Sequence, residues 1–277
     1  MTSKDLTIII VTFKSDHKIV KCLRTIDSNF RVIIVENSKN YDFKKQIEKQ
    51  FANVECIIAG ENLGYARANN LALKNIKTKF SLILNPDTFL TKTTLDNFFI
   101  FLRKDLDFSI LGPANAINKS NDKVTDLIEV NNIKGHAMFL NMNKFKDIGF
   151  FDENFFLYLE EIDLCERVKK NNGKIYLDKN ITVEHQGGQS VNQTYALEVE
   201  LARNWHWMWS TFYYSKKKNN FFIALIIILP KLFKACFKTL FYAIIFDKKL
   251  KLIYLYRLKG IFNSLINKPS WYRPNIK

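Results

Sequence analysis

The sequence contains few cysteines. Only Cys22, Cys56, Cys165 and Cys236 are present, and no two of them form a Cys-x-x-Cys pair. Scattered cysteines of this kind argue against a disulfide framework or a cysteine-based zinc site and favour reduced, packed thiols in a cytosolic protein. The start of the sequence also lacks a basic stretch followed by an apolar segment and a small-residue cleavage site, so we expect no secretory signal.

Acidic residues are almost absent from the last part of the chain. From residue 215 onward the sequence has fourteen Lys and Arg but only one acid, Asp247, whereas the rest is nearly neutral despite the net charge of +15. A neutral body and a basic tail are physically different objects. Since 277 residues suffice for one core of ordinary size plus an appendage, we predict a main domain over 1–215 and a basic helical tail over 216–277.

Short β-branched runs alternate with helical patterns in the body. The pattern predicts helices in "DHKIVKCLRTI", "FKKQIEKQF" and "YARANNLALKNI", between strands at 6–12, 31–37, 54–59 and 80–85. This alternation is typical of an α/β fold with a mostly parallel sheet covered by helices on both faces. Such sheets bind ligands at the carboxyl ends of their strands.

Polar residues follow the predicted strands at those ends. They are Thr12, Glu36 with Asn37, the loop 61–64, and the segment Asn85-Pro86-Asp87. Asp87 has two interpretations: a turn or helix-capping residue, or one carboxylate ligand of Mg²⁺ or Mn²⁺ whose remaining ligands are diphosphate oxygens and water. Gly64 likewise either completes a turn or lets the backbone approach a nucleotide closely.

The stretch 149–170, "GFFDENFFLYLEEIDLCERVKK", sets Glu160, Glu161 and Asp163 behind an aromatic run. Carboxylates this close repel one another, so they require a cation, a shared proton or water. On a helix Glu160 and Glu161 diverge by about 100° and do not point at one atom. Asp163 and Arg167, at i and i+4, are spaced to pair. The alternative for all three acids is a solvated first helical turn favoured by the helix dipole.

Six segments in order resemble one family. They are "VTFKS", "VENS", "ENLGYARANN", "LNPD", "IKGHAMFLNMNKFKDIGFFDENFFLYLEEIDLCERV" and "VEHQGGQS". The series is similar to the family 2 glycosyltransferases of the GT-A fold, specifically the rhamnosyltransferase-like branch, over residues 6–190. The resemblance implies a Rossmann-like α/β sheet, a nucleotide-diphosphate sugar donor and a divalent metal.

The resemblance also implies which residues bind the donor. Thr12 and Glu36 are expected to bind the base and the ribose, and Glu36 replaces the Asp that the family usually has at this position. The residues that match the family's "N-x-G" segment are expected to line the nucleotide and its phosphates. They are Asn62, Gly64, Arg67 and Asn70. The first acid of the family's metal-binding D-x-D motif is replaced here by Asn85.

The reactive groups are implied in the same way. Asp87 matches the last acid of the D-x-D motif, and His185 matches a histidine that reaches the metal or the leaving diphosphate. Glu161 matches the base that takes the proton from the acceptor hydroxyl, again with Glu in place of Asp, and Glu160 is the alternative base. Imidazole is an acceptable Mn²⁺ ligand, and imidazolium would favour a departing anion.

Gly135 precedes His136 in "IKGHAMFL". We expect Gly135 to let the chain pass close to the donor sugar, with a bulge glycine as the alternative. We interpret His136 as structural, as is usual for a lone histidine.

The basic tail combines apolar runs with lysines. Lys231, Lys234 and Lys238 recur every three or four residues after the run "FFIALIIIL", so they occupy one helical face opposite Phe, Leu and Ile. Spanning a bilayer would cost about 2.5 to 3.5 kcal/mol for each such lysine, which favours a helix lying in the interface of an anionic membrane. The alternatives are a short re-entrant segment at 221–229 and a helical pair that packs on the body.

The sequence therefore predicts a metal-dependent inverting glycosyltransferase, peripheral to the cytoplasmic face of the plasma membrane. Its expected donor is a dTDP or UDP sugar, with dTDP-rhamnose preferred, and its acceptor a lipid-linked or polysaccharide glycan. The alternative is a catalytically silent membrane scaffold of the same fold, motivated by the substitutions at Glu36, Asn85 and Glu161. No nucleic-acid partner is expected, because the basic residues accompany long apolar runs.

Overall fold

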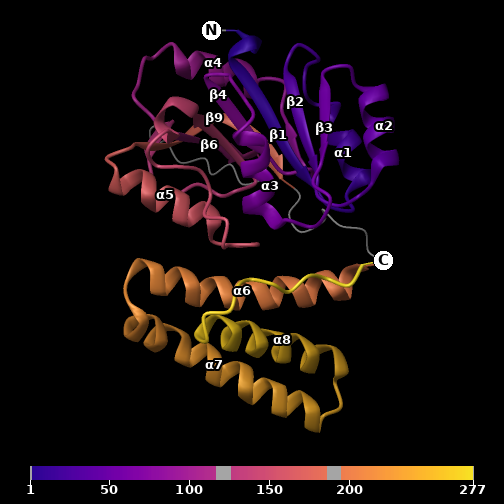
Figure 1. The fold of residues 1–277 in the computed structure, drawn as a ribbon. Coiled ribbons are helices and arrows are strands. Elements are labelled where there is room, and N and C mark those ends of the chain that lie inside the picture. Colours follow the sequence, from indigo (N-terminus) through magenta and orange to yellow (C-terminus); the bar gives the residue numbers. More distant parts are fainter. Residues whose placement is uncertain (1, 117–125, 186–194, 277) are drawn as a thin grey trace. The chain divides into compact units, whose positions relative to one another are not determined.

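The computed structural model of the protein describes residues 2–116, 126–185 and 195–276 (Figure 1). The chain forms two compact units. The first, here the N-terminal unit, comprises Met1–Asp152 and Glu161–Val191. The second, the C-terminal unit, comprises Glu153–Glu160 and Asn192–Lys277. The segment 149–170 therefore passes from the first unit into the second and back.

The N-terminal unit is a sheet with helices on both sides. Its strands are β1 (Leu6–Thr12), β2 (Arg31–Glu36), β3 (Val54–Ile58), β4 (Phe80–Leu84), β5 (Thr88–Leu90), β6 (Ile110–Asn115), β7 (Leu127–Glu129), β8 (Ala137–Asn141) and β9 (Ile175–His185). Its helices are α1 (Asp16–Leu23), α2 (Tyr41–Gln50), α3 (Gly64–Leu73), α4 (Thr94–Leu102) and α5 (Glu160–Lys170), with the 3-10 turns η1 (Ser3–Asp5) and η3 (Met142–Phe145). The strand order is β3-β2-β1-β4-β8-β6-β9-β5, and β7 pairs with β9.

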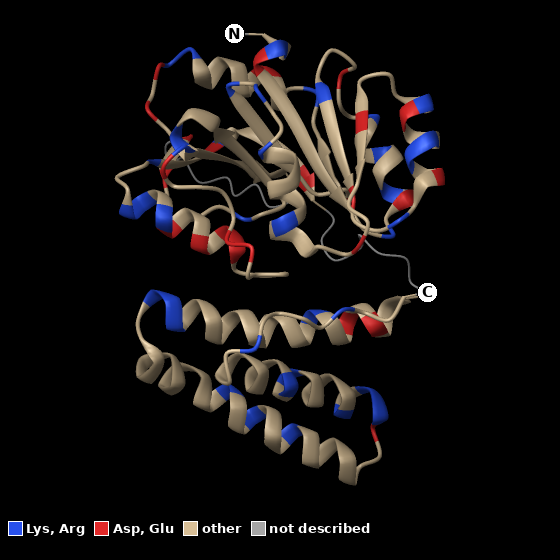
Figure 2. Ribbon diagram, in the orientation of Figure 1, with Lys and Arg blue, Asp and Glu red and all other residues tan. Residues whose placement is uncertain are grey.

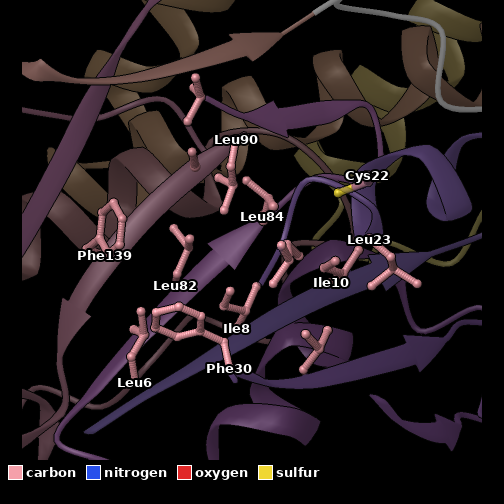
Figure 3. Close-up of a cluster of buried hydrophobic side chains, with 14 of the residues drawn as sticks. Leu6, Ile8, Ile10, Cys22, Leu23, Phe30, Leu82, Leu84, Leu90 and Phe139 are labelled. Atoms are coloured by element: carbon pink, nitrogen blue, oxygen red, sulfur yellow. The ribbon is translucent and has the colours of Figure 1, made fainter. Parts of the chain in front are cut away.

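The first half of the sheet is parallel, as the sequence predicts. β2 pairs with β3, and β1 lies between β2 and β4, all in parallel register. Side chains alternate across a strand, so Leu6, Ile8 and Ile10 of β1 enter one core with Cys22 and Leu23 of α1 (Figure 3). Residues of α2 and α4 belong to the same core. The helix α3 packs against β1 and β2 without contributing a described residue to that cluster, and therefore covers the other face.

The second half of the sheet is mixed. β8 runs antiparallel to both β4 and β6, and β9 is parallel to β6 but antiparallel to β5 and β7. The antiparallel pairs bring segments that follow β4 into register with residues far away in sequence. Leu84 pairs with Ala137, and Thr88 pairs with His185. This half of the sheet assembles the candidate site.

The C-terminal unit consists of three helices and two flanking segments. Its helices are α6 (Ala196–Lys218), α7 (Phe221–Ile244) and α8 (Lys248–Leu265), which pack on one another. At Gly260 the backbones of α8 and α6 nearly touch, because a Cβ there would lie 2.2 Å from the carbonyl oxygen of Trp205. The boundary predicted after residue 215 falls inside α6, which packs with α7 and α8, so the compact C-terminal unit begins earlier in the chain.

The aromatic run before the acids docks on α6. Phe156 stacks on His206 with ring centroids 4.3 Å apart, and the carbonyl of Leu157 accepts a hydrogen bond from Ser210 at 2.8 Å. Tyr158 and Leu159 then adopt left-handed backbone angles, with φ of 72° and 68°. Two such residues in succession are strained, and they turn the chain sharply into the start of α5.

The helix α7 has an inner and an outer apolar face. Ala224, Ile228 and Ala235 are buried against the rest of the unit. Six large side chains, each 64% to 75% exposed, form a stripe on the outside: Phe222, Ile226, Phe233, Phe237, Leu240 and Ile244. Successive residues of an α-helix are rotated by about 100°. Lys231, Lys234 and Lys238, the predicted lysine face, therefore lie between this stripe and the buried face. Figure 2 shows Lys and Arg along α7 and α8 with few acids near them. Among the described residues, no helix is both long and apolar enough to cross a bilayer.

The side chain of His206 ties the C-terminal segment to α6. Its Nε2 lies 2.8 Å from the carbonyl oxygen of Tyr272, to which it donates, and its Nδ1 lies 3.0 Å from Ser270 Oγ, from which it accepts. Burial, opposed by the bond to Tyr272 and reinforced by the charge of Arg273, lowers the pKa of His206 to about 3. The folded state therefore holds a neutral imidazole.

This pKa predicts an acid-sensitive C-terminal unit. The histidine of the unfolded chain titrates near pH 6.5, whereas the folded one stays neutral to a lower pH. The free energy of unfolding is therefore highest above pH 6.5 and decreases as the pH falls towards 3, by up to about 1.4 kcal/mol per pH unit. Between pH 6.5 and 4.5, His206→Gln should remove this slope. All four tryptophans belong to this unit, so tryptophan fluorescence during urea unfolding reports on it. An unchanged slope in the variant would contradict the assignment.

Candidate active site

The carboxylate of Asp87 lies at the end of β4. A turn closed by the bond from the amide of Thr88 to the carbonyl of Asn85, 3.0 Å, carries the chain from β4 into β5. Asp87 within it is only 2% exposed, and its Oδ1 accepts no hydrogen bond from any described residue. Nδ1 of His185 lies 3.6 Å from this oxygen. Burying a carboxylate oxygen without a hydrogen bond is costly, so this oxygen is suited to a cation.

Two histidines stack beside this carboxylate. His136 and His185 have ring centroids 4.4 Å apart and planes within 8°. His185 Nδ1 is 2.9 Å from Thr88 Oγ1, and the carbonyl of His136 accepts the amide proton of Asn85 at 2.9 Å. Burial, then the charges of His185 and Lys134, lower the pKa of His136 to about 4. His136, interpreted from the sequence as structural, therefore lies in the site as a neutral ring.

Glu161 reaches the same edge of the sheet through Gly135. A Cβ on Gly135 would lie 3.6 Å from Cβ of Glu161 and 3.3 Å from the hydroxyl oxygen of Tyr65, which donates a hydrogen bond to the carbonyl of Gly135. The loop before β8, the start of α3 and the start of α5 thus meet at a position where only glycine fits without displacement. Glu160, which is 4% exposed, precedes Glu161 on α5.

A hard divalent cation would find part of its coordination shell here. Asp87 offers a buried carboxylate oxygen and His185 an imidazole, the ligand types that Mn²⁺ accepts. In the parts of the chain that the structure describes, no three His, Cys, Asp or Glu side chains are grouped to hold a metal. The remaining ligands would therefore be oxygens of a substrate or of water, which suits a diphosphate-bound metal.

Predicted nucleotide-binding residues lie at the carboxyl ends of β1 and β2. Thr12 ends β1, and its buried Oγ1 has no hydrogen-bond partner among the described residues. Glu36 ends β2, but its carboxylate already accepts bonds from the backbone and hydroxyl of Ser38 and from the amide of Asn40, at 2.6–3.1 Å. Glu36 therefore shapes the loop after β2, and the hydroxyl of Thr12 faces no described partner.

Asn37 and Asn62 lock the loop before α3. The amide of Asn37 donates to Asn62 Oδ1 and to the carbonyl of Gly64, both at 3.1 Å, and accepts from the amide of Leu63 at 2.8 Å. Gly64 has φ of 79°, a conformation that residues with a Cβ adopt only with strain. Its position at the helix start is thus fixed by backbone geometry.

The two remaining donor candidates on α3 differ. Asn70 is buried, and its amide pairs with the backbone of Phe151 in both directions, at 2.9 and 3.1 Å. It therefore serves as a link between α3 and the segment before α5. Arg67 lies on the exposed side of α3.

Asp163 and Arg167 form the predicted i,i+4 pair. Arg167 Nε is 2.9 Å from Asp163 Oδ2, and Asp163 is 5% exposed. The guanidinium also donates to the carbonyls of Ile148, Gly149 and Phe150. This pair therefore positions the segment that precedes the aromatic run, and neither residue lines the edge occupied by Asp87.

A cavity of about 510 Å³ opens beside the histidines. It lies within the N-terminal unit and is lined by His136, His185, Lys134 and Lys179, with amide and apolar side chains from β6 and β9. Lys134 and Lys179 were not singled out from the sequence: Lys134 lies within the segment "IKGHAMFL" without an assigned role, and Lys179 lies outside the six segments. Asn37 was named from the sequence only as the neighbour of Glu36, and no role was predicted for it.

The family model described as Glycosyl transferase family 2 matches residues 7–165. The chain therefore belongs to glycosyl transferase family 2, and the predicted family and GT-A fold are confirmed.

Two sequence relatives and one solved structure are similar to this chain, the structure in fold alone. The low-salt glycan biosynthesis hexosyltransferase Agl10 of Haloferax volcanii is 25% identical over 217 residues, which cover 69% of this chain and 69% of Agl10. The teichoic acid poly(glycerol phosphate) polymerase of Staphylococcus epidermidis is 26% identical over 133 residues, which cover 45% of this chain but only 18% of the polymerase. A mannosyltransferase of Pyrobaculum calidifontis, solved with GDP-Man and Mn²⁺, superposes with a TM-score of 0.61 at 12% identity, over 95% of this chain and 88% of that one.

The Asp163–Arg167 pair predicts an asymmetric response to mutation. Arg167→Ala should lower the free energy of unfolding of the N-terminal unit by about 3 to 5 kcal/mol, because it leaves a buried carboxylate without its partner. The double variant Asp163→Asn/Arg167→Ala should lose less. Chemical unfolding followed by circular dichroism measures both. Lys170→Ala, which removes the exposed pair with Glu166 on the same helix, is the matched control and should cost less than about 1 kcal/mol. Equal losses for Arg167→Ala and the control would contradict a positioning role.

Proposed function

We propose that this protein is an inverting glycosyltransferase that moves a sugar from a nucleotide-diphosphate donor to an acceptor hydroxyl. One observation carries the proposal: in a family 2 chain, Asp87 lies 3.6 Å from His185, whose ring stacks on His136, and Glu161 lies against Gly135, the neighbour of His136. Membership of the family supports the reaction class, and the buried carboxylate supports a polar, charged reaction centre.

The donor diphosphate belongs at Asp87 and His185. Asp87 has a buried oxygen that no described side chain or backbone amide uses, and His185 is held in place by Thr88. When bound, Mg²⁺ or Mn²⁺ supplies Lewis-acid stabilisation of the negative charge on the leaving group. The P. calidifontis neighbour, solved with Mn²⁺ and GDP-Man, supports this use of a metal by analogy. His136, kept neutral, adds no competing positive charge.

Glu161 is the proposed base. Its carboxylate removes the proton from the acceptor hydroxyl while that oxygen forms a bond to the anomeric carbon. The bond between the anomeric carbon and the diphosphate breaks on the opposite face, so the configuration inverts. Gly135 supports this role because its lack of a side chain lets Glu161 lie against the loop that carries His136.

We propose dTDP-rhamnose as the donor to test first. The motif series of the rhamnosyltransferase-like branch supports it, whereas the names of the relatives point to hexoses in general and, for one neighbour, to GDP-mannose. The carboxylate of Glu36 is already hydrogen-bonded to the loop 38–40, so the shape of the pocket rather than Glu36 would select the nucleotide. Donor screening with dTDP, UDP and GDP sugars therefore decides this point.

The acceptor is proposed to be lipid-linked and the protein to bind the cytoplasmic face of the plasma membrane. The outer stripe of α7 exposes apolar side chains over about 33 Å of helix, with lysines along one side. This combination fits a helix that inserts its stripe among acyl chains while its lysines meet anionic headgroups. Attachment of this kind would bring the enzyme to a lipid-linked substrate.

Substitution of the proposed base tests the reaction. Glu161→Gln keeps the shape of the side chain but cannot accept a proton, so the rate of sugar transfer should fall by at least about 100-fold, while donor binding changes little. Asp87→Asn should instead weaken metal-dependent donor binding. Glu166→Gln, at a partly buried position on the same helix, is the matched control. The assay measures sugar transfer to acceptors extracted from cells. If Glu161→Gln transfers sugar at nearly the wild-type rate, Glu161 is not the base.

The silent scaffold remains the competing function. It predicts that no nucleotide sugar is hydrolysed or transferred at any metal concentration, although the fold is intact. Metal-dependent hydrolysis of one nucleotide sugar by the wild-type protein would exclude it.

The stripe on α7 predicts the strength of membrane binding. Each phenylalanine withdrawn from water contributes about 1.5 to 3 kcal/mol, so Phe233→Glu/Phe237→Glu should bind vesicles of anionic lipid at least about tenfold more weakly. Vesicle co-sedimentation at low and high salt measures this. Ile100→Glu/Leu106→Glu, which changes two exposed apolar residues of the N-terminal unit, is the matched control. Equal binding by both double variants would show that the stripe has another use.

A further inference from the structure

The cavity beside the histidines carries positive charge. Two ammonium groups, Lys134 and Lys179, line it together with the amides of Asn115 and Asn132, and none of the described residues of its lining is acidic. Among the residues that the structure describes, neither lysine forms an ion pair. By contrast, Lys169 on the nearby α5 lies 3.6 Å from Glu129. An unbalanced pair of cations in a concave site attracts an anion.

Lys179 reaches the cavity because β9 is bulged. Pro113 of β6 pairs with Asp178, but the next residue, Ala114, pairs with Thr182, so 179–181 have no partners on β6. Bulges of this kind redirect side chains and are common next to binding sites.

The bulge is held from two sides. Asp178 Oδ1 accepts the amide proton of Asn180 at 2.9 Å, and the side chain of Asn97 on α4 donates to the carbonyl of Asn180 at 2.6 Å. The position of Lys179 is therefore built into the sheet and is not an accident of a loose surface loop.

The cavity lies on the acceptor side of the sheet. In the strand order, β1 and β2, whose ends carry Thr12 and Glu36, are on one side of β4, whereas β6 and β9 are on the other. Asp87 follows β4 and separates the two regions. The described lining of the cavity comes from β6, β9, the segment before β8 and the start of β8, and it includes none of the predicted nucleotide-binding residues.

The cavity also adjoins the reacting groups. His136 and His185 line it, and His185 Nδ1 is 3.6 Å from Asp87 Oδ1. Lys134 precedes Gly135, against which Glu161 lies. A molecule that occupies the cavity is therefore within reach of both the proposed leaving-group site and the proposed base.

We infer that Lys134 and Lys179 bind a phosphate group of the acceptor and so select phosphate-bearing acceptors. This inference rests on the proposed glycosyl transfer. Two cations match the charge of about −1.5 to −2 on a phosphate monoester better than the single charge of a carboxylate. The apolar part of the wall, including Ile133 and Leu177, suits the carbon skeleton next to that phosphate. The similarity to a poly(glycerol phosphate) polymerase is consistent with a phosphate-containing substrate.

Binding of simple phosphate esters tests the inference. The full chain is first saturated with the nucleoside diphosphate and metal that stabilise it most, which blocks the donor site, and is then titrated calorimetrically with glycerol 3-phosphate, glycerate and glycerol. Octyl phosphate and octyl glucoside, below their micelle concentrations, form a second series. Glycerol 3-phosphate represents a soluble phosphate chain and octyl phosphate a lipid headgroup, so the stronger ligand identifies the source of the phosphate.

The expected result is a preference for phosphate that depends on the two lysines. Phosphate probes should bind the wild type at least about fivefold more tightly than glycerate or the uncharged probes, and Lys134→Gln/Lys179→Gln should lose at least about tenfold in phosphate affinity. Lys134→Arg/Lys179→Arg should restore most of it. The matched control Lys104→Gln/Lys146→Gln removes two charges elsewhere on the same unit and should stay within about twofold of wild type.

Two failures can be told apart. If no nucleotide sugar is bound or turned over, the proposed function fails, whatever the phosphate probes do. If the donor is used but the phosphate probes bind no better than glycerate, or bind both Gln double variants equally, the selection of phosphate by Lys134 and Lys179 is overturned and glycosyl transfer stands.

Discussion

The register of two antiparallel strand pairs decides which side chains meet in the candidate active site. Pairing of Leu84 with Ala137 puts His136 next to Asn85, and pairing of Thr88 with His185 puts that histidine beside Asp87. Successive residues of a strand point to opposite faces, so a shift of one residue in either pair would turn a histidine away from the carboxylate. The buried residues of β4 and β8 oppose such a shift. Both faces of these strands are packed, with Leu82, Leu84 and Phe139 on one face and Ile83, Met138 and Leu140 on the other, so a shift would exchange side chains of different shape in two cores at once. The hydrophobic core thus fixes the chemistry at its edge.

Three buried or partly buried acids show how hydrogen bonding separates structural from functional carboxylates. Asp163 is satisfied by the guanidinium of Arg167, and Glu36 by amides and a hydroxyl of its own loop. Asp87 is buried to a similar degree, yet one of its oxygens meets only a histidine at 3.6 Å. Since the desolvation of each carboxylate is a comparable cost, the first two are offset within the fold, whereas the third is best offset by a ligand.

Sequence patterns predicted the parts of the structure that depend on local periodicity. Strand ends at Thr12 and Glu36 and the pair Asp163–Arg167 follow from spacings of two, three or four residues, and all are present, while β4 ends at Leu84, one residue before the predicted end. The antiparallel half of the sheet depends on contacts between distant segments, which periodicity does not encode. For the same reason the bulge that directs Lys179 into the cavity was not predictable, nor was the use of Asn70 to bind the backbone of Phe151. The start of the C-terminal unit was misplaced because α6 is too mixed in composition to be assigned to either part without its contacts.

The exposed apolar face of α7 bears on which acceptor the enzyme would use. A helix that only completes a three-helix unit needs one apolar face, and the face with Ala224, Ile228 and Ala235 already provides it. The second face, with Phe233 and Phe237, leaves large apolar side chains in water, which is unfavourable unless something covers them. Lysines along its border favour an anionic apolar surface over another protein core. A lipid phosphate matches the proposed roles of both units: its apolar chain lies in the membrane into which the stripe of α7 would insert, and its phosphate would bind Lys134 and Lys179. Because these features belong to separate units and rest on separate observations, the loss of one would leave the case for the other unchanged.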